Sequence, residues 1–383
     1  MLGKNKTLGI LGGGQLGKMI LDVSNRWGLK VYVLDSNIEC PSSKLCSKFF
    51  VGDLMDFDTV VQFGQNVDLI TIEIENVNVE ALKFLESKGK KVFPQPRVIE
   101  IIQDKSKQKE FYIDNEIPTS SFRSCNGIEE LKSLISKGEI SYPFIWKASK
   151  MGYDGYGVNK ISDNKSLEKL SDCHCIVEEL ISIKKELSVM VGLRESGEIL
   201  NYPVVEMEFN KDSNQVEYIL SPAQISKELK IKAEKLACNI AEKFKICGII
   251  AVEMFLTNQD EILVNEVAPR PHNSYHFSIE GSYTSQFEQF LRAILDLPLG
   301  STKILQNSVM VNLVGEKNSK GIVEYKNFDQ IIGIEGVNPH IYGKLETKPN
   351  RKMGHITIIN EDIEIAKTIA KEIKETIIIT TRK

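Results

Sequence analysis

The apolar residues of the first hundred positions fall into short runs separated by amphipathic stretches. Thr7–Leu11, Lys30–Asp35 and Asp68–Glu73 are short and mainly apolar, which is typical of strands buried in a parallel sheet. Lys18–Trp27, between the first two runs, has the spacing of a helix. This alternation predicts a Rossmann-like α/β domain with a parallel sheet over residues 1–103.

Beyond residue 103, helices and strands follow one another in a mixed order. The pattern predicts an α+β domain over residues 104–298 and a small α/β domain over residues 299–383, joined at Leu297–Gly300. Helices are expected over Asp104–Asn115, Ser226–Lys245 and Ser285–Leu295, and strands over Pro143–Lys147, Cys175–Ile181, Lys185–Val191, Gly248–Leu256 and Glu261–Val267.

The last two of these strands place two carboxylates opposite each other. If the turn centres near Gln259, Glu253 and Glu266 lie across from one another on the same face of a β-hairpin. Like charges about 4 Å apart repel by roughly 4 kcal/mol at an effective dielectric constant near 20, and a bound divalent cation would turn that cost into a gain. A slip of one residue would move one carboxylate to the other face. The alternative is an ordinary hairpin with both acids in solvent, but the flanking residues are too apolar for that, so a metal site is predicted.

The composition narrows the class of protein. Hydrophobic residues make up 42% and charged residues 26%, as in globular proteins. The net charge of −4 gives no signature of nucleic-acid binding. There is no run of 18 apolar residues and no secretory signal pattern, so a cytoplasmic protein without a membrane partner is expected. The seven cysteines lack zinc spacing and are expected to be reduced thiols.

A glycine turn follows the first predicted strand. Its spacing, Gly12-x-Gly14-x-x-Gly17 with Asp35 downstream, formally fits a dinucleotide fingerprint. Backbone N–H groups at a helix N-terminus can bind any phosphate, however. Three interpretations therefore remain: a nicotinamide cofactor, the phosphate of a substrate, and a purely structural turn. The substrate phosphate is the favoured one.

A second glycine-rich loop, residues 148–157, follows Lys147 at the end of a predicted strand. Such a loop can close over phosphates while the strand lysine meets them as a point charge. Glu178, Glu179 and Glu186 lie on the next two strands, where a carboxylate can hold ribose hydroxyls. A flexible surface loop and solvated edge charges are the alternatives.

The segment Ala268–His276 directly follows Glu266 and carries a guanidinium, an amide and two imidazoles. A structural loop seldom concentrates so many polar groups, so a functional loop beside the metal pair is predicted. Zinc ligation is less consistent, because prolines break the segment and the spacing is not that of a zincin helix. A further basic cluster is either a solvated face, which composition favours, or a phosphate site: Lys344, Lys348, Arg351, Lys352 and His355.

Together these motifs resemble the ATP-grasp superfamily over nearly the whole chain. They are most similar to its branch that carboxylates aminoimidazole ribonucleotide in purine biosynthesis. The segments that carry the resemblance are Gly12–Met19, Thr71–Val77, Gly152–Gly157, Asn265–Ser274 and Arg351–His355. The resemblance implies an ATP-grasp fold with a lid at about residues 115–182, and ATP and Mg²⁺ as cofactors. It also implies aminoimidazole ribonucleotide and bicarbonate as substrates, and a homodimer.

The resemblance also implies roles for individual residues. Contacts to ATP are expected from Lys105, Lys147, Glu178, Glu179, Leu180, Ile181, Glu186, Asn265 and Glu266, with Gly152, Tyr153, Asp154, Gly155, Tyr156, Gly157 and Val158 as the lid. The metal ligands are expected to be Glu253 and Glu266. Expected contacts to the ribonucleotide are Glu73, Tyr153, Arg270, His272 and Asn273, with Gly14, Gln15, Lys344 and Arg351 at its phosphate. The four residues expected to act in catalysis are Arg270, Glu73, Tyr153 and His272.

Four positions depart from the pattern of the branch. Met151 and Tyr275 replace glycines, Phe209 replaces a histidine that commonly contacts the nucleotide, and Lys105 stands where some relatives have arginine. Lys105 keeps the charge and loses the bidentate fork. None of the four belongs to the predicted metal pair.

The implied chemistry is phosphoryl transfer from ATP to bicarbonate, which gives carboxyphosphate. The amine of the ribonucleotide then captures its carbon, either directly or after release of carbon dioxide. Arg270 is expected to stabilise bicarbonate and its phosphate ester, and Glu73 to orient or deprotonate the amine. The sequence leaves three alternatives: an ATP-grasp ligase that uses formate or an amino acid, a nicotinamide-dependent oxidoreductase, and a non-catalytic nucleotide-binding protein.

Overall fold

The computed structural model describes residues 6–150, 157–210 and 215–382. The N-terminal part forms a parallel sheet, as predicted, and its strands lie in the order β3-β2-β1-β4-β5. Its elements are β1 (Thr7–Leu11), α1 (Gln15–Arg26), β2 (Lys30–Asp35), β3 (Lys48–Val51), α2 (Phe57–Gln65), β4 (Leu69–Ile72), α3 (Val79–Ser87), β5 (Lys91–Val92) and α4 (Pro96–Ile102).

Helix α1 begins three residues earlier than predicted. Gly14 is its N-cap, so Gln15 and Gly17 of the glycine turn already belong to the helix. Leu16 is buried, and its side chain joins those of Met19 and Ile20 in the core. The prediction from Lys18 onwards was therefore wrong at this end, because the glycines disguised the first helical turn.

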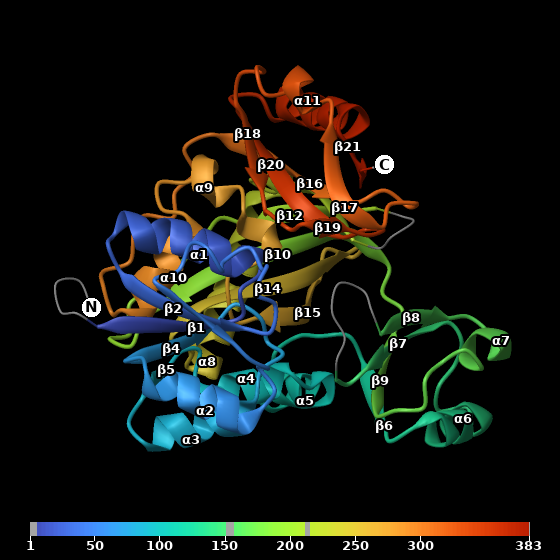
Figure 1. Ribbon diagram of the computed structural model, residues 1–383. Helices are drawn as coiled ribbons and strands as arrows, with labels where there is room; N and C mark the ends of the chain where they lie inside the picture. The colour runs from blue at the N-terminus through green and yellow to red at the C-terminus, as the bar shows by residue number, and fades with distance from the viewer. Residues whose placement is uncertain (1–5, 151–156, 211–214, 383) are drawn as a thin grey trace.

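A four-stranded antiparallel sheet forms a separate layer, green and at the lower right in Figure 1. Its order is β6-β9-β7-β8, and it has its own small core around Phe144 and Trp146. The predicted strand Cys175–Ile181 ends at Glu179. The elements are β6 (Phe122–Cys125), α6 (Ile128–Ser136), β7 (Phe144–Ala148), β8 (Val158–Ile161), α7 (Asn164–Leu167) and β9 (Cys175–Glu179).

The body of the molecule is a nine-stranded sheet in the order β15-β14-β10-β12-β13-β16-β20-β18, with β11 paired to β10. Its central-region elements are α5 (Lys105–Asp114), β10 (Ile183–Leu193), β11 (Ile199–Asn201), β12 (Val205–Phe209), β13 (Val216–Ser221), α8 (Lys227–Phe244), β14 (Gly248–Thr257), β15 (Ile262–Ala268), the 3-10 turn Asn273–Tyr275, α9 (Ser278–Gly281) and α10 (Gln286–Ile294).

The C-terminal part continues this sheet, because β16 pairs with β13 in antiparallel register. The predicted boundary near residue 298 therefore lies within one continuous sheet. A small sheet, β19-β17-β21, adjoins it. The elements are β16 (Asn307–Val314), β17 (Gly321–Lys326), the 3-10 turn Phe328–Gln330, β18 (Val337–Ile341), β19 (Glu346–Thr347), β20 (Lys352–Asn360), α11 (Ile363–Thr376) and β21 (Ile378–Thr381).

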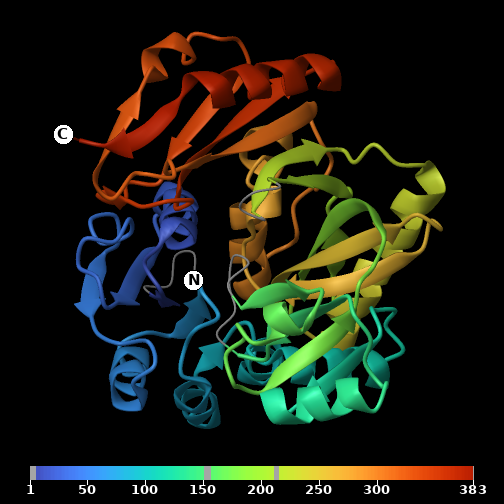
Figure 2. The same ribbon diagram turned by 90° about the vertical axis from the view of Figure 1, so that its right-hand side faces the viewer.

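Two cores cover the two faces of the large sheet. Helix α8 packs on one face, where Ala237 and Phe244 meet Val189 and Ile250. Helix α10 and the N-terminal domain pack on the other face. Figure 2 shows the N-terminal domain, in blue, to the left of the green and yellow strands and below the C-terminal elements, in red. Within the described ranges, none of the helices has the length and apolarity that crossing a bilayer requires.

Candidate functional site

The hairpin of β14 and β15 brings the two predicted carboxylates together. Glu253 pairs with Glu266, as expected. The register near the turn, where Leu256 pairs with Ile262, would by itself put Asn265 opposite Glu253. Asn265 is instead the extra residue of a β-bulge, so the predicted pair is confirmed but depends on a feature that the turn alone does not supply.

The two carboxylates have opposite electrostatic environments. Burial raises the pKa of Glu253 to about 8, and the charges of Glu266 and Glu186 add to this effect. The ammonium of Lys105, 2.7 Å from Oε2 of Glu266, lowers the pKa of Glu266 to about 2. Near neutral pH the pair therefore carries one negative charge and keeps one proton, which is how two close acids avoid repulsion.

Two predicted lysines point at the bulge. Lys105, the first residue of α5, donates to Glu266. Lys147, on β7 of the four-stranded sheet, donates to Oδ1 of Asn265 at 3.0 Å. The two ammonium groups thus reach the same stretch of β15 from two different layers, which is a suitable arrangement for binding polyphosphate.

A buried ion-pair network lies behind these lysines. Glu178 is 2.8 Å from Lys147 and 2.9 Å from Lys109. Burial raises the pKa of Glu178, but the charges of the two lysines outweigh burial and leave this pKa lowered. Burial lowers the pKa of Lys109 to about 8. The sequence analysis missed Lys109, because a lysine on a polar helix looks solvated. It donates to Thr119 and Ser120 as well as pairing with Glu178.

Glu186 lies on the same face of the sheet as Glu253. It pairs across strands with Phe255, while Ser188, two residues on, pairs with Glu253. Burial raises the pKa of Glu186 to about 7, and Lys147 opposes this shift. The predicted ribose carboxylate therefore lies on the same face of the large sheet as Glu253.

The predicted hinge and lid residues are only partly described. Glu179 and Leu180 are exposed, and together with Ile181 they lead from the four-stranded sheet into β10. Gly157 accepts a hydrogen bond from the backbone N–H of Ala148 through its carbonyl oxygen, and Val158 begins β8 opposite Lys147. Outside the described residues lie Met151, Gly152, Tyr153, Asp154, Gly155 and Tyr156.

The loop after β15 brings Arg270 into contact with the N-terminal domain. Its Nη2 atom lies 2.7 Å from Oε2 of Glu75, and its Nη1 atom donates to the carbonyl oxygen of Pro271. Arg270 also lowers the pKa of Glu73, although burial of that carboxyl is the larger effect and leaves its pKa raised. Arg270 thus lies beside two carboxylates of the N-terminal domain.

Both ring nitrogens of His272 have a side-chain oxygen nearby. Its Nε2 atom lies 3.4 Å from Oε1 of Glu253, and its Nδ1 atom is 2.8 Å from Oγ of Ser274. Gln286 on α10 accepts from the backbone N–H of His272 and donates to its carbonyl oxygen. The next residue, Asn273, exchanges two amide hydrogen bonds of 2.9 Å with Asn312 of β16. The loop is therefore fixed to the body and to the C-terminal part.

The glycine turn surrounds internal carboxylates. The N–H groups of Gly14 and Gly17 donate to the two oxygens of Glu73, and the N–H of Gly13 donates to Asp35. Gln15 opens α1 beside them. The anion at this helix N-terminus is therefore a side chain of the protein, and the predicted contact of Gly14 with a substrate phosphate stays a prediction.

The basic cluster near the C-terminus is split by the structure. Lys344 donates to the carbonyl oxygen of Lys352, and Arg351 donates to that of Glu346. Lys18 of α1 donates to the carbonyl of Ile341, so this segment adjoins the glycine turn. His355 does not belong to the cluster.

His355 is fully buried, and its ring stacks on His340, with centroids 4.5 Å apart. The ring of His276 also lies near that of His355, with centroids 4.8 Å apart, and its Nδ1 atom contacts Gln286. Burial lowers the pKa of both His276 and His355 well below the ordinary value. Tyr275 is also buried and bonds to backbone oxygens. The assignment of His355 to a solvated basic face was therefore wrong.

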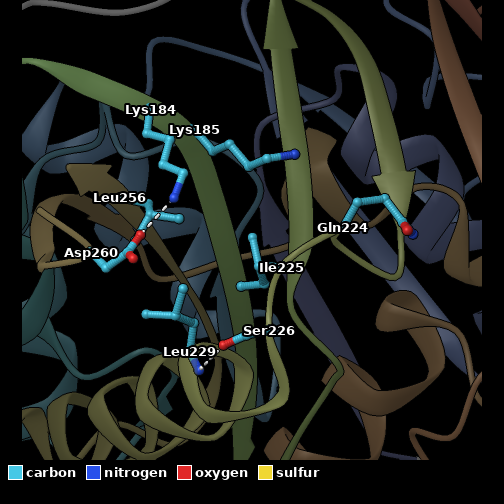
Figure 3. Close-up of a pocket in the computed structure, with 8 residues that line it drawn as sticks. All are labelled: Lys184, Lys185, Gln224, Ile225, Ser226, Leu229, Leu256 and Asp260. Atoms are coloured by element: carbon cyan, nitrogen blue, oxygen red, sulfur yellow. Dashed lines mark hydrogen bonds and ion pairs between the residues drawn. The ribbon is translucent and has the colours of Figure 1, made fainter. Parts of the chain in front are cut away.

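A cavity of about 440 Å³ lies on the opposite face of the large sheet from Glu253 (Figure 3). Its lining comes from β10, β14, α8, the segment just before α8 and the turn between β14 and β15. Lys184 pairs with Asp260, and Lys185 pairs with Glu206. The described residues that line this cavity include none of the predicted site residues.

The donor set at the hairpin suits a hard cation. Glu253 and Glu266 provide carboxylate oxygens and Asn265 an amide oxygen, while Mg²⁺ typically takes one or two carboxylates and completes its shell with water and phosphate. Among the described residues, no group of three or more His, Cys, Asp or Glu side chains could hold a metal by itself, so a zinc centre is not supported there. All seven cysteines are free, as expected.

Three protein-family models match successive parts of this chain. Residues 5–103 match the ribonucleotide synthetase preATP-grasp domain, residues 110–287 the ATP-grasp domain, and residues 308–368 the phosphoribosylaminoimidazole carboxylase C-terminal domain. Phosphoribosylaminoimidazole carboxylase of Saccharomyces cerevisiae is 37% identical over 93% of this chain. The chain spans 64% of the length of that relative.

Two solved structures match over nearly the full chain. N5-carboxyaminoimidazole ribonucleotide synthetase from Thermotoga maritima is 40% identical, with a TM-score of 0.91, over 98% of this chain and 100% of the other. N5-carboxyaminoimidazole synthase from Aspergillus clavatus, solved with ADP and 5-aminoimidazole ribonucleotide, is 32% identical, with a TM-score of 0.88, over 97% of this chain and 98% of the other. This chain therefore belongs to the N5-carboxyaminoimidazole ribonucleotide synthase family of the ATP-grasp superfamily.

Proposed function

We propose that this protein is an ATP-dependent ligase that carboxylates 5-aminoimidazole ribonucleotide to N5-carboxyaminoimidazole ribonucleotide in purine biosynthesis. Bicarbonate supplies the carbon, and ATP is converted to ADP and phosphate. The observation that carries the proposal is the hairpin carboxylate pair, Glu253 and Glu266, with the ammonium groups of Lys105 and Lys147 directed at the same bulge.

The first step is phosphoryl transfer. An oxygen of bicarbonate attacks the γ-phosphorus of ATP, the bond to the leaving ADP oxygen breaks, and carboxyphosphate forms. Lys105 and Lys147 hold the phosphates, and Glu186 holds the ribose. Glu253 and Glu266 would hold Mg²⁺, which would neutralise negative charge on the phosphates.

The second step forms the carbamate. The exocyclic amine of the ribonucleotide attacks the carbon of carboxyphosphate, the bond between that carbon and the phosphate oxygen breaks, and the nitrogen loses a proton. Arg270 stabilises the anionic carboxyl group. Glu73 orients the amine, with Tyr153, His272 and Asn273 as further contacts to the ribonucleotide.

The phosphate of the ribonucleotide is assigned to the glycine turn and the adjoining C-terminal segment. Gly14 and Gln15 lie at the start of α1. The hydrogen bond from Lys18 of α1 to the carbonyl oxygen of Ile341, three residues before Lys344, supports this assignment. The N–H of Gly14 donates a hydrogen bond to Oε1 of Glu73. Phosphate binding there therefore requires this N–H to bond to both groups or to change its partner. Homodimer assembly and a cytoplasmic location complete the proposal.

The test is ADP formation measured with each candidate substrate in turn. The purified chain with Mg²⁺-ATP is expected to release ADP only when both aminoimidazole ribonucleotide and bicarbonate are present, and to consume the aromatic amine in equal amount. ADP release with formate or an amino acid in place of bicarbonate would instead assign a different ATP-grasp ligase. Tight NADH binding without any ATP turnover would support the oxidoreductase alternative. Retained ATP binding without turnover under all conditions would support a non-catalytic protein.

A further inference from the structure

The guanidinium of Arg270 is held by a carboxylate from another domain. Its Nη2 atom lies 2.7 Å from Oε2 of Glu75, and the two side chains are only 19% and 23% exposed. Arg270 comes from the loop that follows β15, whereas Glu75 follows β4 of the N-terminal sheet. An ion pair with this geometry and little solvent is among the stronger polar contacts in a protein.

The segment that carries Glu75 is itself fixed. Gln103, just after α4, donates from Nε2 to the carbonyl oxygens of Glu75 and Val77, at 2.6 and 2.8 Å. The backbone N–H of Glu73 donates to Leu11 of β1. Glu75 is therefore presented by a rigid stretch of chain, as a residue that positions another side chain must be.

We propose that Glu75 is a positioning residue for the carboxylation reaction: it holds the guanidinium of Arg270 in the orientation that meets bicarbonate and carboxyphosphate. This inference rests on the proposed function of Arg270. An arginine side chain has many rotamers, and holding one of them in advance removes an ordering cost from the reaction. Residues that orient a functional group through one hydrogen bond typically change activity roughly 10- to 100-fold when replaced.

Two other roles for Glu75, masking Arg270 or only joining two domains, predict different kinetic results. If Glu75 masked Arg270 and had to be displaced by bicarbonate, removing its charge would lower the KM for bicarbonate. If Glu75 merely joined two domains, its loss would affect ATP and bicarbonate alike. Either of these results would overturn the positioning role.

The experiment uses Glu75→Gln, which keeps the shape of the side chain and removes its charge. We expect kcat/KM for bicarbonate to fall roughly 10- to 100-fold, while KM for ATP changes by less than about twofold. We also expect more ADP to form than aromatic amine is consumed, because poorly held carboxyphosphate is lost to water. Glu75→Asp, which keeps the charge but shortens its reach, is expected to recover part of the loss.

Lys91→Gln is the matched control. Lys91 pairs with Glu195 and also joins the N-terminal domain to the central part, but both side chains are about half exposed and neither is predicted in the site. Its loss is expected to leave both the kinetics and the ratio of ADP to amine consumed unchanged. Thermal unfolding of the two variants then compares their effects on domain docking.

A double-mutant cycle with Arg270→Lys isolates the contact. If Glu75 acts through Arg270, Glu75→Gln has little further effect in the Arg270→Lys background. Additive losses, or a change below about twofold in Glu75→Gln alone, would overturn the inference. Absence of turnover dependent on both ribonucleotide and bicarbonate in the unmodified chain would instead overturn the proposed function, so the two failures are distinguishable.

Discussion

Replacing Glu253 by glutamine is expected to make the ligand-free protein more stable, by an amount that increases with pH. Glu253 faces Glu266 across the hairpin and has only 13% of its side chain exposed. In the folded chain it must either keep a proton or place a second negative charge beside the first. Glutamine has a similar shape and needs neither.

The magnitude follows from the two pKa values. Burial raises the pKa of Glu253 from 4.5 to about 8, so its contribution to stability is complete below pH 4.5 and is lost as the pH rises towards 8. Between pH 5.5 and 7.5 the unfolded chain releases this proton and the folded chain keeps it. Two pH units at 1.36 kcal/mol each give an upper limit of about 2.7 kcal/mol. Relaxation around the pair reduces this to roughly 1–2 kcal/mol.

The assay is urea unfolding of both proteins without divalent cations at several pH values in this range. The free energy of unfolding of Glu253→Gln should exceed that of the unmodified chain by a margin that grows by roughly 1–2 kcal/mol over this range. Most other titratable groups are the same in both proteins and cancel in the difference. Mg²⁺ with ATP should then stabilise the unmodified chain and have much less effect on the variant. Glu261→Gln, at the exposed turn of the same hairpin, is the control, and its effect should not depend on pH. A constant difference between pH 5.5 and 7.5, or a less stable Glu253→Gln at every pH, would refute the reasoning.

Three further predictions concern other contacts. Lys109→Met leaves Glu178 with Lys147 alone and should lower the free energy of unfolding, measured in urea, by roughly 3 kcal/mol. The control Lys107→Met breaks an exposed ion pair and should lower it by less than about 1 kcal/mol. Equal effects of the two substitutions would contradict the buried network. Gly12→Ala should lower the midpoint of thermal unfolding, because Gly12 has a φ of 99° and a Cβ atom there would lie 2.6 Å from Cγ of Glu73. An unchanged midpoint would show that the turn can relax. Asn312→Asp sets a carboxylate oxygen against the amide oxygen of Asn273. It should raise KM for the ribonucleotide several-fold, equivalent to roughly 1 kcal/mol of lost binding, and leave KM for ATP unchanged. Initial-rate kinetics would measure both constants, and parallel changes in the two would point to general unfolding instead.

Local patterns predicted the strands and helices that carry the carboxylate pair, but fewer than half of all the described elements, and not the way they join. The parallel N-terminal sheet and the hairpin followed from apolar runs, because burial on one or both faces leaves a direct mark on the sequence. Pairing of β13 with β16 joins segments about 90 residues apart, and no local periodicity reports such a contact. The start of α1 was hidden by glycines, which have no side chain to show the helical face.

The carboxylate pair was predicted from charge and chemistry. Lys109 and His355 were misjudged because the local sequence does not show which charged or polar side chains the fold buries. Glu253 and Glu266 were found because two acids in an apolar hairpin conflict with their surroundings. Lys109 was missed because its neighbours on α5 are polar, and burial by β9 is a tertiary effect. His355 was misplaced for the converse reason: basic residues surround it in the sequence, while aromatic rings surround it in space.

The lysines at the bulge already hold oxygen partners before any nucleotide arrives. Lys105 is bound to Glu266 and Lys147 to Asn265. Entering phosphates must compete for these ammonium groups. When Lys105 binds phosphate it releases the carboxylate of Glu266, which a magnesium ion would take. Nucleotide and ion should therefore bind with positive cooperativity, each assisting the other, and the empty enzyme should have little affinity for either alone.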